Sequence, residues 1–176
     1  MNFFQRFFGH IKTLITHKYY VFIHAVKAGI PWRGLVHDMS KFSPSEFIPG
    51  VKYYNGKRSP NETERAENGY SLAWMHHKGR NKHHYEYWTD YSMETKTLVP
   101  VKMPLKYVKE MFCDRLAAGK TYMGSSYTDA DPLKYYNRKK DHRDIHPETA
   151  RLLEELLVML SEKGERAVFE YIRSLK

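Results

Sequence analysis

His37-Asp38-Met39-Ser40-Lys41 places an imidazole, a carboxylate and an ammonium group within about one helical turn. Hydrophobic spacing typical of helices flanks this stretch on both sides, so we predict that it lies within a helical fold. Groups of such different chemistry are hard to hold side by side without a ligand that they share. The stretch therefore indicates a metal or substrate site inside an all-α protein.

N-terminal to this stretch, the sequence predicts one long helix from Phe3 to Ala28, which Gly29 and Pro31 end. A short helix over 32–41 is then expected to carry the His-Asp pair. The apolar start of the first helix consists of Phe3, Phe4, Phe7, Phe8 and Ile11. We expect these residues to pack on the domain rather than to dock on a membrane, because helices normally bury such a face.

C-terminal to the stretch, Ser43-Pro44-Ser45-Glu46 predicts a helix start in which Glu46 caps the helix; a part for Glu46 in the site is the alternative. The turn residues of 55–61 predict a loop, and a helix from about Glu62 leads into His76-His77. Residues 89–102 are expected to be irregular and no strand is expected. Further helices are predicted over 105–118, ended by Gly119, over 146–163, ended by Gly164, and from there to Leu175.

These elements predict an all-α, single-domain helical bundle with a C-terminal helical hairpin. We expect residues 1–120 to form the core that carries the site and residues 121–176 to form a helical extension. A chain of 176 residues fits one domain, and 15% aromatic residues favour a globular fold. The one cysteine, Cys113, excludes an internal disulfide and indicates a reducing compartment, so we expect a cytoplasmic protein. We also expect no transmembrane segment.

The formal charge of +9 favours anionic partners. A phosphorylated small molecule is the expected partner and nucleic acid is the alternative, although the sequence has no RNA-binding signature.

Histidines recur at a spacing of seven in the first helix. His10, His17 and His24 therefore share one face, but each step of seven moves roughly 10 Å along the axis, so that at most one or two can reach a common point. We select His17, with His24 as the alternative.

Two histidine pairs follow, His76-His77 and His83-His84. Consecutive residues of a helix face different directions, so we expect one histidine of each pair to bind a metal and its neighbour to support the site. Asp114 lies in a helix that is apolar on more than one side, where an aspartate needs a partner; metal ligation is favoured over an ion pair. The candidate metal ligands are His17, His37, Asp38, His77, His83, His84 and Asp114, and the choice within each histidine pair stays open.

These residues resemble the motifs of the HD-domain superfamily, which consists of helical metal-dependent phosphohydrolases. His17 is similar to the first histidine of that family, and His37-Asp38-Met39-Ser40-Lys41 to its central signature, with Ser40 where glycine is usual. Asp114 is similar to its closing aspartate. The chain also resembles a bacterial and phage family of unassigned function that carries His-Asp-x-Ser-Lys-Phe-Ser-Pro together with Asn-Lys-His-His.

The resemblance implies one or two divalent ions, of Mn, Fe, Co, Ni, Zn or Mg, and hydrolysis of a phosphomonoester, phosphodiester or nucleotide by a metal-bound hydroxide. Asp38 and Lys41 are the predicted catalytic residues, and Lys41 is expected to offset charge on the phosphoryl oxygens. Arg80, Asn81, Lys82 and Arg115 are predicted to bind substrate. Two alternatives stay open, namely a di-iron oxygenase and a non-catalytic, metal-stabilised module that binds nucleic acid or phospholigands.

Overall fold

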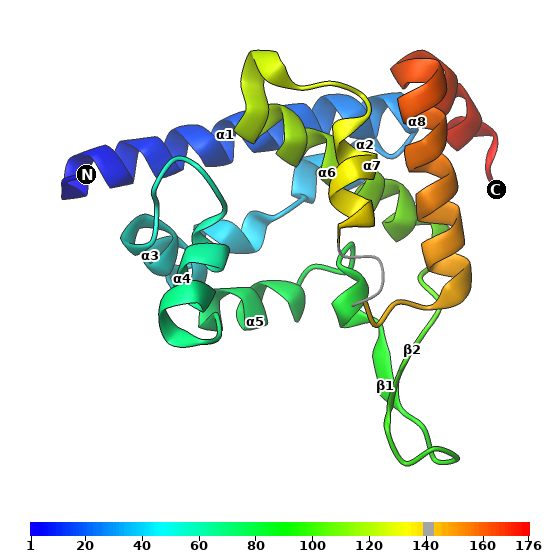
Figure 1. Ribbon diagram of the computed structural model, residues 1–176, viewed down its shortest axis with the longest axis horizontal. Coiled ribbons are helices and arrows are strands. Elements are labelled where there is room, and N and C mark those ends of the chain that lie inside the picture. Colours follow the sequence, from blue (N-terminus) through cyan, green and yellow to red (C-terminus); the bar gives the residue numbers. More distant parts are fainter. Residues whose placement is uncertain (139–142) are drawn as a thin grey trace.

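A long N-terminal helix, α1 (Phe3–Lys27), runs along one side of the molecule in the computed structural model, which describes residues 1–138 and 143–176. Helices α2 (Pro31–Val36), α3 (Pro44–Lys52) and α6 (Leu105–Met123) pack against α1 (Figure 1). Asn2 and Gln5 form a capping box that fixes the start of α1. The helix ends at Lys27, and the next turn contains Gly29 with a φ of 76°.

The apolar N-terminal face of α1 is only partly covered. Phe7 and Ile11 are half-buried, as expected, and Phe7 contacts the ring of Phe47. Phe3, Phe4 and Phe8 are instead 64–67% exposed, so the predicted packing on the domain is wrong for these three. The reason is geometric, because Phe4 and Phe8 lie on the side of α1 that faces away from the other helices, and the first turn, which contains Phe3, projects beyond them (Figure 1).

The predicted helix from about Glu62 to His77 is two helices, α4 (Pro60–Asn68) and α5 (Leu72–Lys78). Gly69 adopts a φ of 80° and ends α4, and the side chain of Ser71 accepts a hydrogen bond from the Trp74 amide at the start of α5. This break turns α5 back towards α3, which it contacts.

The segment predicted to be irregular contains a small antiparallel hairpin, so the expectation of no strand is wrong. Strand β1 (Thr89–Tyr91) pairs with β2 (Leu98–Pro100), with Asp90 opposite Val99. A 3₁₀ turn, η2 (Tyr85–Tyr87), precedes the hairpin. The two strands project away from the helices (Figure 1) and are too short to alter the all-α class.

Helix α6 continues four residues past Gly119, where we predicted its end, and Gly124 with a φ of 56° follows it. Gly119 serves close packing instead, because a Cβ atom there would lie 2.8 Å from the ring of Tyr127. The turn η3 (Gly124–Ser126) and helix α7 (Asp131–Asn137) form the connector that follows.

The C-terminal helical hairpin is confirmed. Helix α8 spans Pro147–Ser174, but Gly164 breaks it with φ 76° and ψ 175°, so that two helical arms lie side by side (Figure 1). Both arms, together with α7 and α6, enclose the main core. Its fully buried residues include Phe112, Leu116, Leu153, Leu156, Leu160 and Ile172. Among the described residues, no helix is long and apolar enough to cross a membrane.

Candidate metal centre

The His-Asp pair lies in a break between helices, not on the predicted helix over 32–41. Helix α2 ends at Val36, Asp38 adopts a left-handed conformation with φ 54° and ψ 26°, and the 3₁₀ turn η1 (Met39–Phe42) begins after it. Aspartate is one of the few residues other than glycine that enter this region readily. The break allows adjacent side chains to converge, since His37 Nε2 lies 3.3 Å from Asp38 Oδ2.

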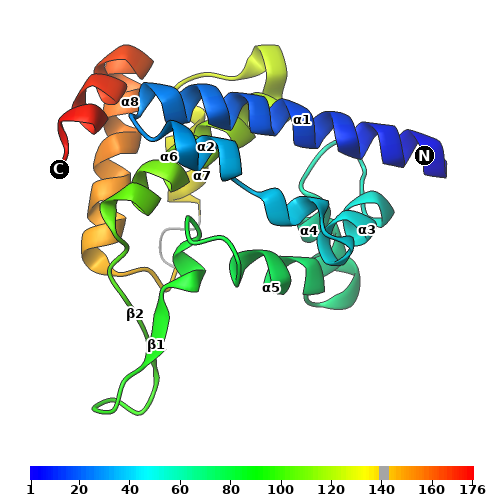
Figure 2. The ribbon, with the colours of Figure 1, turned by 180° about the vertical axis from the view of Figure 1, so that it is seen from behind.

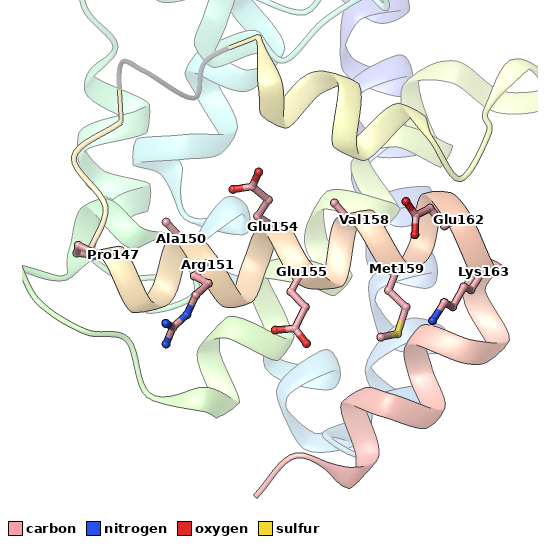
Figure 3. A pocket seen from close by; sticks show the side chains of 9 residues that line it. All are labelled: Pro147, Ala150, Arg151, Glu154, Glu155, Val158, Met159, Glu162 and Lys163. Atoms are coloured by element: carbon pink, nitrogen blue, oxygen red, sulfur yellow. The ribbon is translucent and has the colours of Figure 1, made fainter.

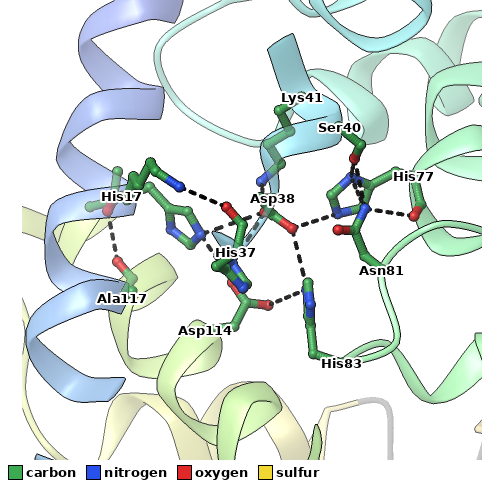
Figure 4. Close-up of polar contacts among 12 residues, drawn as sticks. His17, His37, Asp38, Ser40, Lys41, His77, Asn81, His83, Asp114 and Ala117 are labelled. Atoms are coloured by element: carbon green, nitrogen blue, oxygen red, sulfur yellow. Dashed lines mark hydrogen bonds and ion pairs between the residues drawn. The ribbon is translucent and has the colours of Figure 1, made fainter. Parts of the chain in front are cut away.

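Asp38 stands at the centre of the site, and each of its carboxylate oxygens faces a different set of side chains (Figure 4). Oδ1 lies 3.3 Å from His77 Nε2 and 3.4 Å from His83 Nε2. Oδ2 lies 3.3 Å from His37 Nε2 and 4.0 Å from His17 Nε2. The carboxylate thus stands between two clusters of imidazoles.

Two groups of four residues each bring one ligand atom to within 4.8 Å of all the others. The first group is Asp38, His77, His83 and His84, and the second is His17, His37, Asp38 and Asp114. Ligand atoms that surround one cation at roughly 2.0–2.2 Å lie close to such separations. Because Asp38 belongs to both groups, the geometry suits two cations that share one carboxylate.

Several of these atoms have no hydrogen-bond partner among the described residues although they are buried. They are Oδ1 of Asp38 and the Nε2 atoms of His17, His37 and His83, whereas Oδ2 of Asp38 has an ion pair with Lys41 Nζ at 2.6 Å. Each buried polar atom without a partner costs about 1–3 kcal/mol, so four of them together are unusual in a folded protein. A divalent cation bound by these atoms would remove that cost, and the donor set of imidazoles and carboxylates fits one.

Glu110 orients two of the imidazoles through contacts with their Nδ1 atoms. Its Oε1 accepts a hydrogen bond from Nδ1 of His37 at 3.0 Å and lies 3.4 Å from Nδ1 of His83. Its Oε2 accepts from Arg33, with Nε at 2.7 Å and Nη2 at 2.6 Å. Both rings therefore present Nε2 to the centre, as expected of metal-binding histidines with a carboxylate behind them.

Glu46 orients the second pair of rings and does not cap α3, so the capping prediction is wrong. Helix α3 has no side-chain hydrogen bond at its cap, and the Glu46 oxygens instead accept from Nδ1 of His76 and of His77, each at 2.7 Å. His77 then presents Nε2 to Asp38, whereas His76 is bound to Glu46 and belongs to neither ligand group. Asn81 also supports His77, by donating to its carbonyl oxygen at 2.8 Å.

Electrostatics keep Asp38, Asp114, His17 and His84 in the protonation states that bind a metal, whereas His37 carries a proton. Burial opposes ionisation of Asp38 and Asp114, but the neighbouring histidines, with Lys41 beside Asp38, hold the pKa of both carboxyls well below its usual range. Burial lowers the pKa of His17 and, together with His83 and His77, that of His84, so both rings stay neutral. Burial acts against a charge on His37, yet Asp38 and Asp114 raise its pKa, so cation binding there would displace a proton.

Lys41 lies at the boundary between the ligands and a cavity of about 190 Å³. Its Nζ is 2.6 Å from Asp38 Oδ2, and it is the cation that compensates this carboxylate in the structure. Besides the ligands His17, Asp38, His77, His84 and Asp114, the wall of the cavity includes Thr13, Leu14, Ser59, Asn61, Trp74 and Tyr122.

The remaining predicted residues lie elsewhere. His10 lines the cavity but belongs to neither group, and His24 stacks on Phe169 with its Nε2 3.9 Å from Glu165, which leaves His17 as the histidine of α1 that joins the site. Of the four residues predicted to bind substrate, Arg80, Asn81, Lys82 and Arg115, none lines the cavity. Arg80 and Lys82 are exposed, and the Arg115 guanidinium lies over the ring of Tyr136 at 6.0 Å.

Sequence reasoning missed two carboxylates that support the site. Glu110 was not predicted as a site residue, and Glu46 was predicted to cap a helix, with a part in the site only as the alternative. Glu110 precedes Asp114 by one helical turn on α6, so the spacing of four was a signal that both face the same way. For the cavity residues Ser59 and Asn61 we find no sequence signal, because their place depends on how α4 folds back.

A second and larger hollow, of about 630 Å³, lies along α8 (Figure 3). Its lining, Pro147, Ala150, Arg151, Glu154, Glu155, Val158, Met159, Glu162 and Lys163, contains no histidine. The potential ligands are gathered at the smaller cavity, which we take as the functional site.

The structure therefore defines a mostly helical protein with a buried cluster of histidines and carboxylates of the kind that holds cations. The chain belongs to a family of unknown function, DUF5662, whose family model matches residues 6–159. This match includes every residue of the two ligand groups. Comparisons with curated proteins and with solved structures each found no match.

Proposed function

We propose that this protein is a metal-dependent phosphohydrolase that acts on small phosphoesters. The observation that carries the proposal is the position of Asp38 between two groups of ligands, with Lys41 at the edge of the adjoining cavity. Sites of this kind, with two cations and a shared carboxylate, suit in-line displacement at phosphorus. The resemblance of His17, His37-Asp38 and Asp114 to the HD-domain motifs supports the same reaction.

One or two divalent cations, when bound, would supply Lewis acidity and lower the pKa of a water molecule from 15.7 towards roughly 7. The chain itself supplies the geometry. Glu110 and Glu46 hold three ligand rings with Nε2 facing Asp38, so these side chains are in position before a cation binds. Lys41 can turn from Asp38 to an anionic substrate and offset charge that develops on the phosphoryl oxygens.

The size of the cavity supports a small substrate. Pockets for drug-sized ligands are usually about 300–1,000 Å³, and this cavity has about 190 Å³. The phosphoryl group would lie beside Lys41 and the ligands. The leaving alcohol would then contact Trp74, Leu14 and Tyr122.

Elemental analysis of untagged protein, followed by a panel of phosphoesters with added Mn, Co, Ni or Mg, tests the proposal. We expect one to two divalent ions per chain, phosphate release with at least one metal, and loss of both in Asp38→Asn. Asp90→Asn, which changes an exposed aspartate on β1, is the matched control and should retain activity. Activity that survives in Asp38→Asn would contradict the assignment.

The two alternatives give different results in the same assays. Bound iron with oxygen-dependent turnover would replace the hydrolase by an oxygenase. Metal binding without turnover of any phosphoester, together with steeply salt-dependent retention of DNA, would favour the binding module.

A further inference from the structure

The outer side of α1 carries an apolar stripe that no part of the described chain covers. Its six residues are 41–67% exposed, and they are Phe4, Phe8, Ile15, Tyr19, Phe22 and Val26. At about 100° per residue, all six fall within an arc of roughly 60°. The stripe therefore runs along almost the whole length of the helix.

Helix α2 widens this stripe. Gly34 packs so closely against α1 that a Cβ atom there would lie 2.5 Å from the Cβ of Ala25, and Figure 2 shows α2 directly beneath α1. Lys18 Nζ donates to the carbonyl oxygen of Leu35 at 2.8 Å and fixes the two elements together. Trp32 is 69% exposed and Leu35 is 51% exposed. We call the α1 stripe together with Trp32 and Leu35 the apolar face.

The part of the chain that carries the apolar face is basic. Residues 1–45 contain a single acidic residue, Asp38, which is 6% exposed and belongs to the metal centre. Lys12 and Lys18 lie in the same part of the chain, and neither forms an ion pair with a described residue, although Lys18 Nζ donates to the Leu35 carbonyl oxygen. By the same helical projection, Lys12 and Lys18 lie on opposite edges of the stripe.

We propose that the apolar face docks on an anionic lipid bilayer. Aromatic and aliphatic side chains flanked by lysines, without exposed carboxylates, match a membrane surface that is apolar inside and negatively charged outside. Trp32, Tyr19 and the phenylalanines are residue types that favour the headgroup boundary. A second copy of the chain is a poorer match, because a two-fold interface would bring these cations together without a counter-charge.

Docking through this face would leave the metal centre accessible. The α1 residues that line the cavity, including Thr13 and His17, lie on the side of the helix away from the stripe. The protein would thus lie on the membrane with its metal centre on the side that faces the aqueous phase. This inference is independent of the proposed reaction.

Flotation with lipid vesicles tests the proposal. One set contains phosphatidylcholine with roughly 30% phosphatidylserine, and the other contains phosphatidylcholine alone. The double variant Phe8→Asp/Ile15→Asp changes two exposed residues of the stripe. The matched control, Met93→Asp/Leu98→Asp, changes two residues of the hairpin region that are 73% and 68% exposed. Circular dichroism confirms that each variant is folded.

We expect the wild type and the hairpin control to float with the anionic vesicles. The partition coefficient of the α1 double variant should be at least about tenfold lower. Raising the salt concentration should weaken binding. Absence of flotation, equal flotation of the α1 variant, or equal binding to uncharged vesicles would overturn the proposal. So would a wild-type dimer, seen by light scattering, that the α1 variant converts to a monomer without any vesicle binding.

Discussion

Glu110 accepts a hydrogen bond from Nδ1 of His37 at 3.0 Å, and this contact determines which nitrogen of the imidazole faces Asp38. Glu110 is 1% exposed, and its other oxygen is held by Arg33. The chain Arg33–Glu110–His37 therefore connects helix α2 to helix α6 and sets the orientation of a candidate ligand at the same time.

Replacing Glu110 by Gln should weaken cation binding by about 10- to 100-fold, because the ring of His37 loses the carboxylate that orients it and raises its basicity. Titration calorimetry with Mn or Zn measures this change. Thermal unfolding in the presence of a chelator measures separately how much stability the fold loses when Arg33 has no carboxylate partner. Glu94→Gln, an exposed change, is the control, and unchanged affinity in Glu110→Gln would contradict the orienting role.

Asp38→Asn and His17→Ala should differ in metal stoichiometry. Asp38 belongs to both ligand groups, so Asp38→Asn should lower the content of both cations, whereas His17→Ala should affect the second group alone. Asparagine also tolerates the left-handed backbone at this position, so the fold should be retained. Plasma emission analysis of untagged protein gives the counts. Loss of the same number of ions in both variants would argue against a shared carboxylate.

Lys41→Met should lower kcat by about 100-fold while cation affinity stays equal or rises. The ammonium group lies 2.6 Å from Asp38 Oδ2 and competes with a cation for that oxygen, so its removal frees the ligand and removes the charge that would stabilise the phosphoryl group. Steady-state kinetics and metal titration separate the two effects. Lys106→Met, on the exposed side of α6, should change neither. A fall in both kcat and cation affinity would assign Lys41 to the integrity of the site instead.

Glu165 should make folding stability depend on pH in the acid range. Burial acts to raise its pKa, but hydrogen bonds from Lys120 and Lys27 outweigh burial and lower it to about 2. The pKa of Glu165 in the folded state is lower than the ordinary value of 4.5 for a glutamate. The stability that this carboxylate contributes is therefore fully present above pH 4.5 and is lost as the pH falls towards 2.

Glu165→Gln should therefore cost roughly 2 kcal/mol at pH 7, and the difference from the wild type should shrink as the pH approaches the folded pKa. Urea unfolding at a series of pH values measures it. Glu170→Gln, which alters an exposed pair with Arg166, should cost less than about 0.5 kcal/mol. A cost for Glu165→Gln that does not vary with pH would show that the ionised carboxylate is not the source of the stability.

The helical class and the C-terminal hairpin follow from local patterns, and these could be predicted. The spacing of Leu153, Leu156 and Leu160 fixes a face of α8, and Gly164 marks the bend. The break at Asp38 could not be predicted, because nothing in the local sequence opposes a helix there. The left-handed backbone depends on the contacts that the side chain makes with distant histidines.

The supporting carboxylates illustrate the same limit. Glu46 satisfies the local pattern of a capping box, yet in the fold it bonds to His76 and His77, which lie 30 and 31 positions further along the chain. A local rule described the helix start correctly but assigned the side chain to the wrong partner. The substrate residues that we predicted were chosen by charge near the histidines, and charge alone carries no information on which residues border the cavity.

The candidate ligands come from four separate parts of the chain: α1, the break after α2, the α5 region and α6. Cations held by the two ligand groups, which share Asp38, would together act as a reversible cross-link between the N-terminal helix and the segment that follows α4. Chelation of the ions would then lower the stability of the fold as well as abolish activity. The concentration of free ion would in turn set the free energy of unfolding.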